Sequence, residues 1–94
     1  MNKKTRKHNG VYSAEWSPAL NMYLMDQMCG SHLIYSDVYE ISEDTFNHFE
    51  DPGFDPGEHI IQFLFSSAGE RTPEQQRLYE IRYAEITGKP LGKE

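Results

Sequence analysis

Two stretches of β-branched and aromatic residues, 11–16 and 33–41, predict strands. Between them, Ser17 and Pro18 combine a helix N-cap with a proline at the first helical position, and Gly30 supplies a left-handed stop. Apolar residues recur at helical spacing between these signals, so we predict a helix over residues 18–29.

The second half of the chain has clearer boundaries. Ser42 caps a short predicted helix over residues 43–49, and a tandem Asp-Pro-Gly at 51–57 predicts turns. The apolar run 59–66 is ambiguous between strand and helix, and its Ile and Phe content favours a strand. Thr72, Pro73 and Gln75 form a capping signature that opens a helix over 73–87, which Gly88 ends.

These elements predict an α+β fold: a small antiparallel sheet of two or three strands with two or three packed helices. The alternative is an all-α bundle of four short helices, which requires residues 56–68 to be helical. The length of 94 residues allows one domain, which we place at residues 11–88. Residues 1–10 are expected to be a basic flexible tail, and residues 89–94 a C-terminal tail.

Charge is distributed unevenly along the chain. No Lys or Arg occurs from residue 8 to residue 70, a stretch that contains eleven acidic residues. The first seven residues carry a charge of +4, and residues 71–94 carry +1, so the net charge is −6. Carboxylates with few cations nearby repel one another and attract basic surfaces of other molecules.

The leading functional hypothesis is therefore a non-enzymatic binding protein and DNA mimic, an inhibitor or modulator of the kind that phages and mobile elements use against host enzymes. Its acidic surface would dock on a basic groove of a nucleic-acid-processing protein. Methionine suits adaptable binding surfaces, so two methionines join the candidates. The candidate partner-binding residues are Glu40, Glu43, Asp44, Glu50, Asp51, Asp55, Glu58, Met22 and Met25.

Two alternatives remain open. A nucleic-acid-binding accessory protein would act through the basic tail, with Lys3, Lys4, Arg6 and Lys7 on phosphates. A metal-binding domain would use residues that lie close in sequence around the tandem turn, although their spacing matches no familiar site. Those residues are His48, Asp51, Asp55, Glu58 and His59.

Catalysis is not expected, because no nucleotide-binding, hydrolase or metalloprotease motif occurs. We expect no cofactor and no metal in the leading hypothesis. Cys29 is the single cysteine, which predicts a reducing, cytoplasmic setting. The longest apolar runs are too short to span a bilayer, so no membrane partner is expected. A homodimer is compatible with the sequence.

Overall fold

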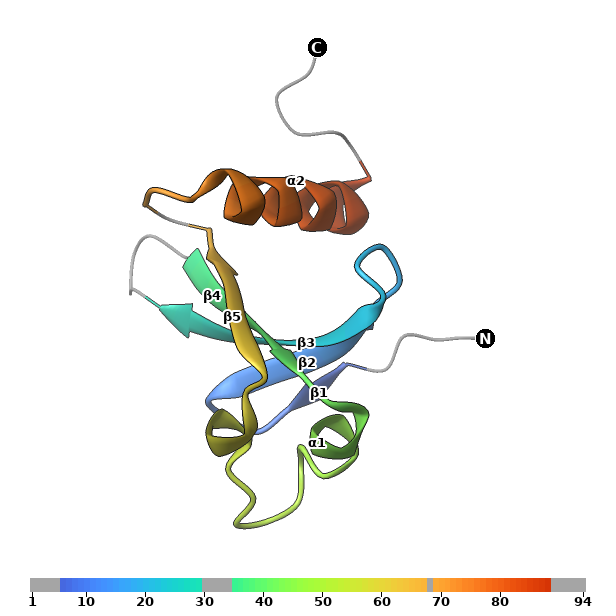
Figure 1. Cartoon of the computed structure of the whole chain (residues 1–94). Coiled ribbons are helices and arrows are strands. Elements are labelled where there is room, and N and C mark those ends of the chain that lie inside the picture. Colours follow the sequence, from blue (N-terminus) through green and yellow to red (C-terminus); the bar gives the residue numbers. More distant parts are fainter. Residues whose placement is uncertain (1–5, 30–34, 68, 89–94) are drawn as a thin grey trace.

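The computed structural model describes residues 6–29, 35–67 and 69–88, and these form one five-stranded antiparallel sheet with short helices around it (Figure 1). The strands follow one another in the order β1-β2-β3-β4-β5, so each pairs with its neighbour in sequence. The strands are β1 (Lys7–His8), β2 (Tyr12–Ser17), β3 (Met22–Cys29), β4 (Tyr35–Ile41) and β5 (Gln62–Ser66). The helices are α1 (Glu43–Asn47), the 3-10 turn η1 (Pro56–His59) and α2 (Pro73–Thr87).

The sheet carries a hydrophobic cluster on each face, because successive strand residues point to opposite sides. On one face, Met25 and Ile41 pack with Phe46 of α1 and with Phe49, which lies two residues beyond the end of that helix. The other face is covered by α2, and its cluster contains Leu24, Val38, Leu64 and Phe65, with Leu78 and Tyr79 packed against them. The sheet therefore separates two small cores.

The structure contradicts the predicted fold class. The sheet has five strands instead of two or three, α2 is the one helix longer than a turn or two in the described residues, and the all-α alternative fails as well. The largest error is the predicted helix over 18–29, most of which is strand β3. The flexible-tail boundary also moves, because Lys7–His8 form β1 and pair with Ser13 and Ala14.

The error at β3 has a local and a tertiary cause. Ser17 and Pro18 do open one turn, since the Asn21 amide donates to the Ser17 carbonyl at 2.7 Å. Asn21 then takes a left-handed conformation with φ of 58° and ends the turn, so the chain returns as a hairpin. Leu24 and Met25 are both buried although successive strand residues point to opposite faces, so β3 lacks polar alternation there and resembles a helix in sequence.

Other predictions are confirmed. The predicted helix over 73–87 has those bounds as α2, with the capping box of Thr72 and Gln75 and a left-handed Gly88 at its end. Ser42 caps α1 by accepting a hydrogen bond from the Thr45 amide. The run 59–66, for which a strand was favoured, is strand from Gln62 onward, and its capping signal forms η1 just before it.

Substitution of Met25 tests the observed position of β3. The sequence predicted that Met25 lies on a helix, outside its apolar stripe, whereas in the structure it is a buried strand residue. Met25 is fully buried (0% exposed), so Met25→Ala should lower the free energy of unfolding by about 2–5 kcal/mol in urea denaturation. The matched control is Val11→Ala at a 60% exposed site, where we expect a change within about 0.5 kcal/mol. Equal effects of the two substitutions would contradict the observed fold.

Candidate functional site

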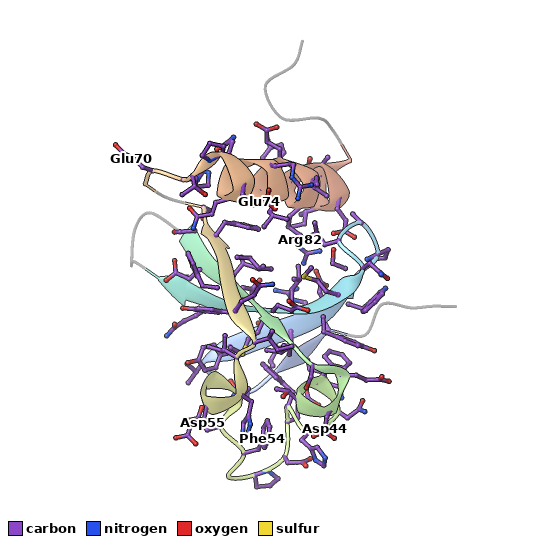
Figure 2. All side chains as sticks on the ribbon, viewed as in Figure 1. Asp44, Phe54, Asp55, Glu70, Glu74 and Arg82 are labelled. Atoms are coloured by element: carbon purple, nitrogen blue, oxygen red, sulfur yellow. The ribbon has the colours of Figure 1, made fainter. Side chains whose placement is uncertain are left out.

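Six exposed carboxylates gather at the end of the molecule opposite α2, and we call this surface the acidic pole (Figure 2). They come from α1, the loop that follows it, and η1, three segments that are close in sequence and lie together in the fold. The acidic pole consists of Glu43, Asp44, Glu50, Asp51, Asp55 and Glu58.

The pole is held in place by residues that point inward from the same segments. Phe46 and Phe49 are buried in the first core cluster, so the carboxylates of α1 must face outward. Glu43 and Asp44 stand in the first turn of α1, where the helix dipole favours negative charge. The pole is therefore built on the elements that cover one face of the sheet.

The tandem turn fixes the other half of the pole. Asp55 caps η1 by accepting a hydrogen bond from the Gly57 amide, and Pro56 is buried. A Cβ at Gly57 would lie 2.7 Å from the Tyr12 hydroxyl oxygen, so a larger residue at this position would have to displace the Tyr12 side chain. Glu50 accepts a hydrogen bond from the His8 amide at 3.1 Å, which ties the loop to β1.

His48 lies between two carboxylates of the pole. Its Nδ1 is 2.8 Å from an Asp51 carboxylate oxygen, and its Nε2 is 3.8 Å from one of Asp44. The hydrogen bond with Asp51, with the charge of Asp44, raises the pKa of His48 above its ordinary value. Protonation of His48 therefore adds one positive charge and makes the pole less negative.

A half-buried aromatic ring, Phe54, packs against both histidines of this region. The Phe54 and His59 rings are stacked with centroids 5.0 Å apart, and the His48 centroid is 5.9 Å from that of Phe54. The sequence contains no signal for this arrangement, because the local pattern around Phe54 does not indicate which side chains will lie beside it in the fold. The ring adds an apolar feature to an otherwise charged surface.

Three carboxylates outside the pole, Glu15, Asp26 and Glu85, are paired with Arg6 or Arg82. Arg6 forms ion pairs with Glu15 at 3.1 Å and Asp26 at 3.2 Å. The buried Arg82 of α2 pairs with Glu15 and, at 2.7 Å, with Glu85. This chain of ion pairs lies in an open cleft of about 420 Å³ between α2 and β2 and joins the N-terminal segment, the sheet and the helix.

The same ion pairs change the acidity of two carboxyls. Burial by itself would raise the pKa of Glu15, but the hydrogen bond and charge of Arg82, together with Arg6, outweigh burial and lower it. Burial also opposes ionisation of Glu85, whose pKa is nevertheless lowered by hydrogen bonds from Ser17 and the Ala19 amide and by Arg82. Both carboxylates therefore stabilise the folded chain when ionised.

The remaining predicted partner residues lie outside the pole. Glu40 is half-buried on β4 and accepts a hydrogen bond from the Gln62 amide group at 2.8 Å. Met22 is half-buried against the second core cluster. Met25 is fully buried in the first cluster, and its side chain is unavailable to a partner.

Of the four cations of the N-terminal segment, the structure describes Arg6 and Lys7, and both contact other parts of the chain. Arg6 is engaged by Glu15 and Asp26, as described above. Lys7 donates from Nζ to the Phe46 carbonyl at 3.0 Å and lies over the Phe46 ring. Lys3 and Lys4 lie outside the described residues. Two of the four candidate phosphate ligands are thus occupied within the chain.

The candidate metal ligands do not come together as a metal site. Within the described residues, no group of three or more His, Cys, Asp or Glu side chains is placed to hold a metal ion. His48 and His59 both contact the Phe54 ring instead. Across the same described ranges, no helix is both long and apolar enough to cross a lipid bilayer.

The fold and the site together define a mostly β domain with an acidic pole at one end. No protein-family model, no curated protein and no solved structure matches this chain.

Loss of the Glu15 carboxylate should weaken the attachment of α2 to the sheet. Glu15→Gln leaves Arg82 with Glu85 alone, so we expect a loss on the order of 2 kcal/mol at pH 7 by urea denaturation. Because the folded pKa of Glu15 is lowered, its contribution is present above the ordinary carboxyl pKa and disappears as the pH falls. The difference in unfolding free energy between variant and wild type should therefore shrink toward about pH 3.

Glu74→Gln, which removes an exposed ion pair with Arg77, is the control and should have far less effect. A pH-independent effect of Glu15→Gln would contradict the assigned pairing.

The contact between His48 and Asp51 is testable by NMR titration. Asp51→Asn removes the charge and weakens the hydrogen bond that raise the pKa of His48, so this pKa should move down toward its ordinary value. Glu58→Gln also removes one charge from the pole but no hydrogen bond to His48. It should shift the His48 titration less, and an equal shift would show that the general field of the pole dominates.

Proposed function

We propose that this chain is a non-enzymatic binding protein that docks its acidic pole on a basic surface of a nucleic-acid-processing protein and thereby blocks or modulates it. One observation carries the proposal. Within the described residues, no Lys or Arg forms an ion pair with any of the six pole carboxylates, whereas Glu15, Asp26, Glu74 and Glu85 all have arginine partners.

Carboxylates that have no Lys or Arg partner give one end of the domain a negative field, which acts on other molecules at a distance. It attracts a cationic surface before contact and increases the association rate, an effect that salt screens. A groove that binds nucleic acid carries Lys and Arg for phosphates, and those same side chains would accept a cluster of carboxylates. The pole thus matches the chemistry of such a groove.

Phe54 and His48 add an apolar contact and a pH-dependent charge to the acidic pole. An exposed ion pair between a carboxylate and a cation contributes little binding free energy, because water solvates both charges. An aromatic ring, in contrast, supplies apolar area that is buried at a protein interface. Phe54 stands among the carboxylates and is only half-buried in the free chain. Protonation of His48 would reduce the attraction, so we expect the interaction to weaken as the pH falls.

The tail remains the alternative route to nucleic acid, and it now depends on Lys3 and Lys4, because Arg6 and Lys7 are engaged within the chain. A gel-shift with duplex DNA and a Lys3→Ala, Lys4→Ala variant separates the two functions. We expect no shift at physiological salt with the wild-type chain. A shift that the variant loses would favour the tail.

The pole is tested by neutralising three of its carboxylates that hold no backbone group: Glu43→Gln, Asp44→Asn and Glu58→Gln. The control triple, Glu70→Gln, Glu74→Gln and Glu80→Gln, removes the same charge from the α2 end of the molecule. Each protein is immobilised and exposed to a nuclease-treated lysate at about 50 mM and about 0.5 M salt. Wild type and control should retain the same nucleic-acid-processing protein at low salt, and the pole variant should lose it.

The kinetics of the captured protein then complete the test. We expect the pole variant to associate about tenfold more slowly and with a weaker dependence on salt than wild type, and the control to stay within about twofold. Equal effects of the two triples would mean that net charge alone drives binding, which would overturn the proposal. Salt-independent binding would overturn it as well.

A further inference from the structure

The two edges of the sheet differ in how well they are protected. β1 is two residues long and carries Lys7 and His8, and the His8 amide donates to the Glu50 carboxylate. Short length, charge and a capped amide are the usual means of preventing an edge from pairing with another chain. β5, at the other edge, has β4 as its one neighbour and contains neither charge nor proline.

The beginning of the β5 edge is exposed and apolar. Three consecutive residues, Ile61, Gln62 and Phe63, are exposed, with Ile61 at 55% and Phe63 at 46%. They lie before a bulge, since Phe63 pairs with Tyr39 and Phe65 with Val38, so that Leu64 is an extra residue. The bulge disturbs the second half of the edge, which leaves residues 61–63 as its regular part.

We propose that a second copy of this chain pairs antiparallel along residues 61–63. The contact is self-complementary: centred on Gln62, it places Ile61 of each copy opposite Phe63 of the other, with the two glutamines facing. Branched and aromatic residues opposite one another are favourable cross-strand pairs. A symmetric dimer of this kind uses the same patch on both subunits.

Charge favours the antiparallel arrangement of two copies over a parallel one. β5 runs from η1, beside the acidic pole, toward α2 (Figure 1). A parallel pair would place two acidic poles side by side, whereas an antiparallel pair points them in opposite directions. Each pole then lies toward the α2 side of the other copy, where residues 69–88 contain three Arg and four Glu and so carry a net charge of −1 instead of the −6 of a second pole.

The contact is small, so the dimer should be weak and concentration-dependent. Three residues per copy bury well under the roughly 1,000 Å² of a stable interface. If the pole acts as proposed above, the dimer presents two binding ends that face apart and engages two partner molecules, a consequence that rests on that function. Dimerisation itself is measured without any partner, so the two proposals fail separately.

Sedimentation velocity of the full chain from about 10 µM to about 1 mM tests the dimer, because weak interfaces associate in this range. We expect a shift from monomer to dimer that Phe63→Lys or Ile61→Lys moves to at least tenfold higher concentration. Val11→Lys, at an exposed apolar site on the β1–β2 turn, adds the same charge and should leave association unchanged. Thermal unfolding of each variant checks that the fold is retained.

Concentration-dependent NMR spectra give a readout that needs no substitution. The amides of residues 61–63 should shift as the concentration rises, while those of β1 stay constant. A monomer at every concentration would overturn the proposal. So would a dimer that Val11→Lys weakens as much as Phe63→Lys, or amide shifts that occur elsewhere and spare residues 61–63.

Discussion

One five-stranded sheet must be covered on both faces by the same short chain, and most other features of the molecule follow from this constraint. α1 and the tandem turn bury one face with Phe46, Phe49 and Pro56. α2 buries the other with Leu78 and Tyr79, but only over the half formed by β3, β4 and β5. Over β2 the helix is held by Arg82 and Glu85 on polar partners. Ion pairs thus complete a covering for which the apolar residues do not suffice, and removing one member leaves a buried charge behind.

The same constraint separates the charges into two groups. Three carboxylates between α2 and the sheet, Glu15, Asp26 and Glu85, are paired with Arg82 or Arg6, and the half-buried Glu15 and Glu85 have lowered pKa values. The carboxylates on α1, on η1 and on the loop between them stand opposite inward-pointing apolar residues and therefore face water. Six of them form the pole, with His48 and Phe54 among them. The surface proposed to bind a basic partner is thus the outer side of a core element, which keeps it rigid.

The N-terminal segment shows how tertiary contacts change the meaning of a charge pattern. Read alone, four cations in seven residues suggest a tail that binds phosphates. In the fold, Arg6 joins β2 and β3 through Glu15 and Asp26, and Lys7 lies on Phe46 of α1. β1 also closes one sheet edge, whereas the other edge is left with exposed Ile61 and Phe63. The two edges of the sheet therefore differ in how readily they could pair with another chain: β1 is protected, and β5 is exposed.

Local chemistry by itself determined α2 with its capping box, the cap of α1, the turns at Asp55 and Gly88, and the strand β4. The caps and turns depend on groups within a few residues of each other, and β4 is indicated by its branched and aromatic residues, so the sequence contains the signal for each. Tertiary structure decided that residues 22–29 are a strand, because a segment buried on both faces shows no alternation. It also decided that Met25 lies in the core, that Glu15 has arginine partners while Asp44 has none in the described part of the chain, and that Ile61 and Phe63 are exposed. These outcomes depend on which distant segments come into contact, and local spacing contains no information about that.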